Sequence, residues 1–269
     1  MDYLLAVLCT VFGWWFSTGL ILGLNHLPRS THKYSMLVNT GLMLWVLACL
    51  PEVAAETTLV AALLAFLQAL VIWGWLEMGY LMGFVTGPSN QACPPEATGW
   101  TRFGLAIKTS LYHELSVVGL VVLVIFVTAG APNQIAALTC VVLWLMRWSA
   151  KLNLFLGVSN FHADWLPRSQ QYLVTYMQTR PINLLFPLSV MVGTACASLF
   201  LHRAVIATDA FSASGYTIVG LLLALGVLEH WFLVLPVQDS RLWQWAMPSG
   251  QPEATPEDSG RGLGSPLTP

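Results

Sequence analysis

The chain has 269 residues, of which 56% are hydrophobic and only 9% are charged, and its formal net charge is −2. Charged residues make up about 25% of a typical water-soluble domain, so this composition excludes an ordinary soluble fold and indicates a membrane protein. The near-zero charge and the absence of a lysine- and arginine-rich run also exclude the basic surface by which proteins bind nucleic acids. We therefore expect membrane lipid as a partner and no nucleic acid.

Seven apolar stretches have the length that a membrane-spanning helix needs, or come close to it. We place them at residues 3–24, 36–50, 57–84, 109–130, 134–157, 183–205 and 217–238. The second stretch is short, and we expect it to end at Pro51. The sequence thus predicts an all-α, polytopic membrane protein of about seven transmembrane helices, with residues 1–246 as a single helical domain.

Lysine and arginine are distributed one-sidedly among the connections between these stretches. They lie after the first, third and fifth spans and after the last one, at Arg29, Lys33, Arg102, Lys108, Arg168, Arg180, Arg241 and Arg261. Because short cytoplasmic loops accumulate these residues, we expect the N-terminus outside and the C-terminus in the cytoplasm. Residues 160–179 mix aromatic and polar side chains, as in a helix or loop at the cytoplasmic interface. Residues 247–269 are rich in Pro, Gly, Ser, Thr and acids, which predicts a disordered cytoplasmic tail.

Seven ionisable side chains fall inside the predicted spans, where each is costly unless it is paired or hydrated. They are Glu77, His113, Glu114, Arg147, Lys151, Glu229 and His230. Counting along helices of alternating direction places those on the third, fourth, fifth and seventh spans on the order of 7 to 14 Å below the cytoplasmic surface. We therefore expect a polar intramembrane cluster at one depth.

Arg147 and Lys151 stand four residues apart, so they share one helix face and need acidic partners. The three glutamates are the available counter-ions, and Asn153 is placed to cap the same network from the side. One interpretation is that these pairs only hold helices together. A ligand, pigment or partner-binding site and a catalytic site are the alternatives, and all three stay open.

The neighbouring pairs His113–Glu114 and Glu229–His230 make His113, His230 and Glu229 candidate metal ligands. Adjacent residues on a helix diverge by about 100°, so each pair aims one member at a common point, which weakens this interpretation. A neutral imidazole of His113 or His230 is also a candidate axial ligand for the magnesium or iron of a porphyrin. No nucleophile motif or phosphate-binding loop is present, so catalytic residues stay unknown and an enzymatic role rests on the cluster alone.

Several sequence blocks within the spans resemble one known family. They are WWFSTG (14–19), IWGWLE (72–77) followed by Gly87-Pro88, YHEL (112–115), SAKLNLFLGV (149–158), NLLFP (183–187) and LEHWFLVLP (228–236). Together they resemble the photosynthetic complex assembly protein 2 family, also called PuhE, of anoxygenic phototrophic bacteria. The resemblance covers most of residues 1–245, and its most specific blocks contain Lys151, Asn153, Glu229 and His230.

The resemblance implies a multi-pass protein of the bacterial cytoplasmic or intracytoplasmic membrane that helps to assemble the photosynthetic apparatus. Its expected partners are subunits of the reaction centre and core antenna. The cofactor is unknown, and bacteriochlorophyll or one of its precursors is the candidate. Two other roles remain open. One is an intramembrane enzyme that uses a metal or acid and base groups on a tetrapyrrole or carotenoid, and the other is a transporter.

Overall fold

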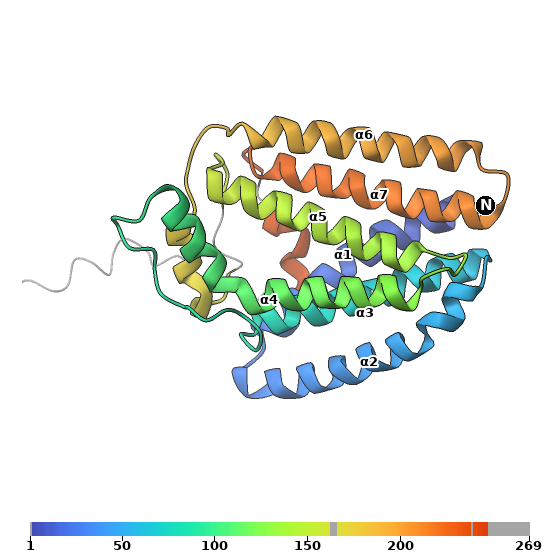
Figure 1. Cartoon of the computed structure of the whole chain (residues 1–269), viewed down its shortest axis with the longest axis horizontal. Coiled ribbons are helices and arrows are strands. Elements are labelled where there is room, and N and C mark those ends of the chain that lie inside the picture. Colours follow the sequence, from blue (N-terminus) through green and yellow to red (C-terminus); the bar gives the residue numbers. More distant parts are fainter. Residues whose placement is uncertain (1, 162–165, 238, 247–269) are drawn as a thin grey trace, which may run out of the picture.

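Seven long helices run side by side along the molecule in the computed structural model, which describes residues 2–161, 166–237 and 239–246 (Figure 1). They are α1 (Asp2–His26), α2 (Arg29–Ala55), α3 (Leu59–Leu81), α4 (Gly99–Val127), α5 (Ile135–Leu156), α6 (Leu185–Ile206) and α7 (Ala210–Phe232). Each is long and apolar enough to cross a membrane. Two short 3₁₀ helices, η1 (Arg168–Tyr176) and η2 (Asp239–Ala246), complete the described part of the chain, which contains no strand. The prediction of an all-α protein with seven spans is confirmed.

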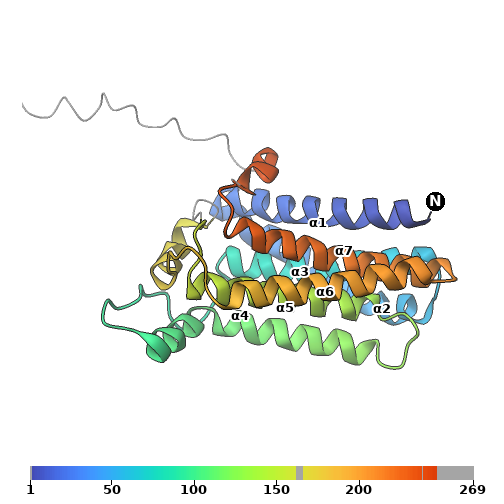
Figure 2. The same ribbon diagram turned by 90° about the horizontal axis from the view of Figure 1, so that it is seen from above.

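The helices α3 and α7 form the centre of the bundle. About half of the most apolar part of each is buried, 50% in α3 and 56% in α7, against 17% in α1 and in α6. Figure 2 shows α1 along one side and α4 along the opposite side, with α7 and α3 between them. The core is built from aliphatic and aromatic side chains such as Phe66, Leu50 and Ile218, all fully buried. Helices such as α1 and α6, which leave apolar side chains on the outside, present those side chains to lipid.

Small residues let the central helices approach their neighbours closely. A Cβ atom on Gly220 of α7 would lie 2.9 Å from the Leu201 side chain of α6 and 3.1 Å from its backbone nitrogen. A Cβ atom on Gly226 would lie 2.7 Å from Cε of Met146 on α5. Because lipid tails are as apolar as side chains, helices in membranes associate largely through such close packing. These contacts hold α5, α6 and α7 together, and the one at Gly226 lies near the polar residues described below.

The prediction that the second span ends at Pro51 is wrong. Helix α2 contains Pro51 and continues to Ala55, and it begins at Arg29 rather than at residue 36. Proline removes one helical hydrogen bond, and helices in membranes tolerate this loss because neighbouring groups compensate for it. Leu50 and Ala54, on either side of the proline, are buried and hold these turns against the bundle. Figure 1 shows that α2 bends in its last turns.

Helix α4 also begins earlier than predicted, at Gly99 rather than at residue 109. The connection before it lies against the helix at the predicted start. The Thr86 carbonyl accepts a hydrogen bond from the His113 backbone N–H at 2.9 Å. Gly87 packs so closely that a Cβ atom would lie 2.1 Å from the Lys108 carbonyl oxygen. The turns of α4 before residue 109 thus extend beyond the apolar stretch that marked the span in the sequence.

Helix α7 begins at Ala210 and ends at Phe232, whereas the sequence predicted residues 217–238. Asp209 caps its start, because its Oδ1 accepts a hydrogen bond from the Ser212 N–H at 2.8 Å. That hydrogen bond keeps the pKa of the exposed Asp209 carboxyl below its usual range. The polar segment before the apolar stretch is therefore helical because of a cap rather than because of hydrophobicity.

The lysines and arginines that the sequence assigned to connections, as far as the structure describes them, lie at one end of the bundle, which we call the basic end. They are in the first turns of α2 and α4 and in the segments around η1 and η2. The basic end also includes the connections 27–28, 82–98 and 157–184, and it is opposite the N-terminus in Figure 1. Within the predicted interfacial segment, the structure has the helix η1. The orientation across the membrane stays a prediction from this charge distribution. Residues 162–165 and the predicted disordered tail, 247–269, lie outside the described residues.

Candidate functional site

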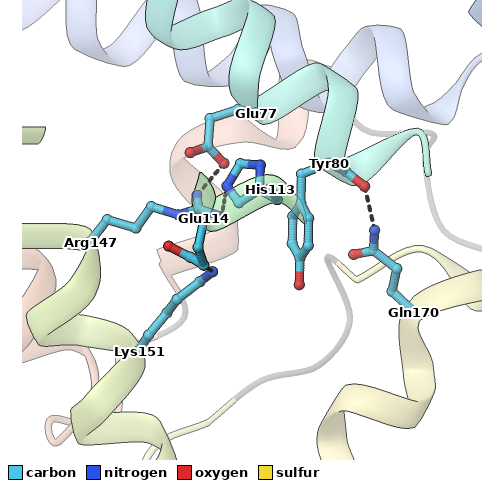
Figure 3. A network of polar contacts seen from close by, with 7 residues as sticks. All are labelled: Glu77, Tyr80, His113, Glu114, Arg147, Lys151 and Gln170. Atoms are coloured by element: carbon cyan, nitrogen blue, oxygen red, sulfur yellow. Dashed lines mark hydrogen bonds and ion pairs between the residues drawn. The ribbon is translucent and has the colours of Figure 1, made fainter. Parts of the chain in front are cut away.

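Five of the predicted intramembrane residues meet between α3, α4 and α5 (Figure 3). Arg147 of α5 pairs with Glu77 of α3, and Lys151 of α5 pairs with Glu114 of α4. The Arg147 Nη2 atom also lies 3.2 Å from Nε2 of His113. All five side chains are largely shielded from solvent by the bundle, and we call them the charge cluster. The pairing meets the requirement that charges in a low dielectric have partners.

Tyr80 packs beside the charge cluster. Its ring centroid lies 4.5 Å from that of His113, 5.5 Å from Cζ of Arg147 and 5.1 Å from Nζ of Lys151. Both cations are thus within cation–π distance of one aromatic ring. The Tyr80 carbonyl accepts a hydrogen bond from Nε2 of Gln170 at 2.5 Å, which connects η1 to the end of α3 (Figure 3).

The contact with Arg147 determines the protonation of His113. A guanidinium can only donate, so Nε2 of His113 accepts and the ring is the neutral tautomer with its proton on Nδ1. Four buried atoms of the charge cluster have no hydrogen-bond partner among the described residues. They are Glu77 Oε1, His113 Nδ1, Glu114 Oε2 and Arg147 Nε. The cluster therefore retains hydrogen-bonding capacity that a ligand or a water molecule can use.

Asn153 and His230 belong to a second polar group, between α5, α6 and α7. The His230 Nδ1–H donates to the Gly226 carbonyl at 2.7 Å, so Nε2 accepts from the Ser149 hydroxyl at 2.8 Å. The Ser149 oxygen lies 2.8 Å from that of Ser189, which accepts from Nδ2 of Asn153 at 3.1 Å. These contacts form one directed chain from Asn153 to the α7 backbone, and they hold the three helices together.

Glu229 faces a different helix. Its Oε1 accepts a hydrogen bond from the Trp14 indole at 2.9 Å, which connects α7 to α1. Arg147 and Lys151 form their ion pairs with Glu77 and Glu114, respectively. The structure thus places five of the eight predicted site residues together and places Asn153, His230 and Glu229 in other contacts. A role for Glu229 as a further counter-ion in this network stays a prediction.

A cavity of about 130 Å³ adjoins the charge cluster at the basic end, and we call it the pocket. It lies between α4 and α5, with η1 contributing Leu173 and Tyr176. Its polar groups include Glu114 and Lys151, and aromatic side chains line much of the rest, among them Tyr80, Phe103, Trp148 and Phe155. An apolar cavity with a few convergent polar groups is the usual form of a small-molecule site.

Arg102 closes the rim of the pocket where α5 ends. Its Nη2 donates to the Phe155 carbonyl, and its Cζ lies 4.1 Å from the centroid of the Phe155 ring. Phe103 packs edge-on against the same ring, at 5.4 Å between centroids. On the η1 side, the Tyr176 hydroxyl donates to the Gln91 carbonyl at 3.0 Å, and burial raises its pKa. The first turns of α4, the last turns of α5 and η1 together form the wall of the pocket.

The candidate metal ligands do not converge. Across the described residues, no group of three or more His, Cys, Asp or Glu side chains is placed to hold a metal ion. The Nε2 atoms of His113 and His230 accept hydrogen bonds from Arg147 and Ser149, and an axial ligand role for either atom requires that contact to be broken. The metal and porphyrin candidates therefore gain no support from the geometry.

Sequence reasoning missed several residues of the two groups. Tyr80 follows Glu77 by three residues, a spacing that puts both on one helix face and was a usable signal. Ser149 stands between the two cations in the SAKLNLFLGV block. Gln170 and Ser189 gave no comparable signal, because a single polar residue in an interfacial segment or in a long apolar helix is common. Only the packing of η1 and α6 reveals them.

Comparison with known proteins places this architecture in a family. Residues 1–254 match the family described as Protein of unknown function (DUF3623). The chain belongs to the DUF3623 family. It is 35% identical over 249 residues to a Rhodobacter capsulatus protein described as an uncharacterized 30.4 kDa protein in the puhA 5′ region, with 91% of each chain covered. No solved structure matches the chain.

Proposed function

We propose that this member of the DUF3623 family is an assembly factor for the bacterial photosynthetic apparatus, acting on the reaction centre and core antenna. The single observation that carries the proposal is the 35% identical relative, of matching length, in the puhA 5′ region. The resemblance of its sequence blocks to the photosynthetic complex assembly protein 2 family supports the same role. The pocket beside the charge cluster is the candidate place where it handles bacteriochlorophyll or a precursor.

Three observations support a binding role for the pocket rather than a purely structural role for its charges. Helices in membranes associate through small residues, as α6 and α7 do at Gly220, and need no buried charges for this. The charge cluster instead borders a cavity, and its Glu114 and Lys151 line that cavity. Buried atoms of the cluster are also without partners among the described residues. A scaffold role alone explains neither the cavity nor the unused hydrogen-bonding capacity.

Deletion of the gene in its native host tests the proposal. We expect a fall in near-infrared absorbance of the core complex, restored by the wild-type gene. Complementation with Glu114→Leu/Lys151→Met removes the charges that line the pocket as a pair, and Lys33→Met removes an exposed lysine at the same end. We expect the first to fail and the second to succeed at equal membrane yield. An unchanged spectrum in the deletion strain, with normal phototrophic growth, contradicts the proposed function.

The pocket also supports a second candidate function, an intramembrane enzyme that acts on a tetrapyrrole or carotenoid. It brings the carboxylate of Glu114 and the ammonium of Lys151 to one cavity, and such groups serve as acid and base. Incubation of the purified protein with candidate pigments, followed by mass spectrometry, separates the two functions. Conversion that depends on both residues supports the enzyme, and recovery of every pigment unchanged supports the assembly factor.

A further inference from the structure

The polar part of the pocket offers one donor and one acceptor side by side. Glu114 is 8% exposed, and its Oε1 pairs with Lys151 while its Oε2 has no partner among the described residues. The Lys151 side chain is 32% exposed, and its ammonium carries three N–H donors, of which the bond to Glu114 uses one. A buried carboxylate with an unused oxygen is costly, so a ligand group that donates to the Glu114 carboxylate and accepts from Nζ is favoured here.

The four charges of the charge cluster balance, and Arg102, a cation at the rim of the pocket, is directed to the Phe155 carbonyl. Lys151 offsets Glu114, Arg147 offsets Glu77, and His113 is neutral because it accepts from the guanidinium. An anionic or cationic ligand group would add an unbalanced charge in a region of low dielectric, at a high desolvation cost. An uncharged group adds none. A hydroxyl is the smallest group that is uncharged and both donates and accepts.

The rest of the pocket selects for an apolar body. Phe103, Phe155 and Trp148 line it, and Phe155 lies one helical turn nearer the basic end than Lys151. The polar pair is therefore below an aromatic rim, on the order of 8 Å beneath the end of α5. A phospholipid headgroup would leave the surface and lose its hydration to reach it. A single hydroxyl on a hydrocarbon chain already dissolves in the bilayer, so it reaches the pair at little cost.

We infer that the pocket binds an uncharged amphiphile with a terminal hydroxyl, a long-chain alcohol, whose O–H donates to Glu114 and whose oxygen accepts from Lys151. The first carbons of its chain contact the aromatic wall of Phe103 and Phe155, because a cavity of about 130 Å³ is too small for a whole long chain. This inference rests on the proposed assembly role, and it assigns to the same pocket a ligand class other than the pigment itself. It also explains why an ion pair is kept at a cavity in the membrane, because the pair supplies both hydrogen bonds without a net charge.

Binding of tritiated hexadecanol to the purified full-length protein in nanodiscs tests the inference. The competitors are hexadecanoate, hexadecyltrimethylammonium and monohexadecanoyl glycerol. Because each charged analogue brings an unbalanced charge into the pocket, we expect hexadecanol to bind at least about tenfold more tightly than either of them. If the glyceride competes equally, the hydroxyl comes from a glycerolipid. If it competes poorly, the ligand is a simple alcohol, and both results support the hydroxyl chemistry.

The double variant Glu114→Leu/Lys151→Met removes both hydrogen bonds and leaves no lone charge. We expect it to lose about tenfold or more in affinity for hexadecanol, while Lys33→Met binds as the wild type does. A photoreactive hexadecanol should label residues 103–114 and 148–155 in a manner that the double variant abolishes. Labelling spread over the lipid-facing helices overturns the inference. Equal affinity of the wild-type protein for hexadecanol and hexadecanoate also overturns it.

The binding assay and the host phenotype fail separately. Absence of selective hexadecanol binding, with loss of core-complex absorbance in the deletion strain, overturns the ligand class and leaves the assembly role in place. Selective binding with a normal spectrum in the deletion strain supports the ligand class and contradicts the assembly role.

Discussion

The ion pair between Glu77 and Arg147 allows a direct test of what the charge cluster contributes to stability. Replacement of Glu77 by methionine leaves the Arg147 charge inside the bundle, where its remaining hydrogen-bonding neighbour among the described residues is the neutral His113 ring. The double variant Glu77→Met/Arg147→Met removes both charges and preserves much of the side-chain volume. We expect the single variant to be severely destabilised and the double variant to recover about half of the loss.

The magnitudes follow from burial. The Glu77 and Arg147 side chains are only 12% and 20% exposed, so little solvent screens a charge left alone. Loss of one partner of a buried pair costs about 3–5 kcal/mol, whereas replacement of both by apolar residues is close to neutral. Because Arg147 also donates to His113, the double variant leaves Nε2 of that ring without its partner, at a cost of about 1–3 kcal/mol.

Reversible unfolding of the purified protein in mixed SDS and mild detergent, followed by circular dichroism, measures the free energies. Glu52→Met is the matched control, because Glu52 is exposed and lies near the end of α2 that is far from the basic end. It should change the free energy of unfolding by less than about 0.5 kcal/mol. A single Glu77→Met variant as stable as this control would refute the reasoning. So would a double variant that is no more stable than the single one.

Three further predictions concern other parts of the fold. Lys151→Ala should lower the membrane yield more than Arg203→Ala does, as measured by quantitative immunoblot. Removal of Lys151 leaves the buried Glu114 carboxylate without its ion-pair partner, whereas Arg203 is exposed in the last turn of α6. Equal yields of the two variants contradict this order. Gly87→Ala should cost about 1–3 kcal/mol of unfolding free energy, because its Cβ atom would lie 2.1 Å from an α4 carbonyl oxygen. Gly119→Ala should be neutral or stabilising, because among the described residues a Cβ atom there would meet no atom beyond its own helix backbone within 4 Å. Similar free energies of unfolding for the Gly87→Ala and Gly119→Ala variants would contradict this prediction. Asn183→Ala should lower the free energy of unfolding by about 2–4 kcal/mol, because the side chain donates hydrogen bonds to carbonyls at the end of α5 and accepts hydrogen bonds from N–H groups at the start of α6. A melting temperature unchanged from the wild type would contradict that role.

The adjacent residues Glu229 and His230 of α7 illustrate what the sequence could predict about the site. Neighbours on a helix diverge by about 100°, so only one of them could face α5. That the imidazole faces Ser149 and the carboxylate faces Trp14 depends on the rotation of α7 about its own axis. The close contact at Gly226 fixes how α7 meets α5, and no local pattern in the sequence encodes that rotation.

His113 and Glu114 behave differently, because both contact α5. The two cations are one helical turn apart and have long side chains, so Arg147 reaches His113 and Lys151 reaches Glu114. The four-residue spacing predicted that both cations share a face and need acids. It did not predict which acid each would pair with, because that depends on α3 and α4 lying on the same side of α5.

The sequence by itself determined the seven spans, the basic end and the gathering of five ionisable residues in one cluster, because hydrophobic length and the cost of a charge in lipid act locally along the chain. It placed the helix ends less well where a cap at Asp209 or a contact at Gly87 decided them. Only the tertiary structure decided the ion-pair partners, the separation of the second polar group and the pocket under η1. Those features depend on which helices are neighbours and how each is rotated, and these are set by close packing between residues far apart in the chain.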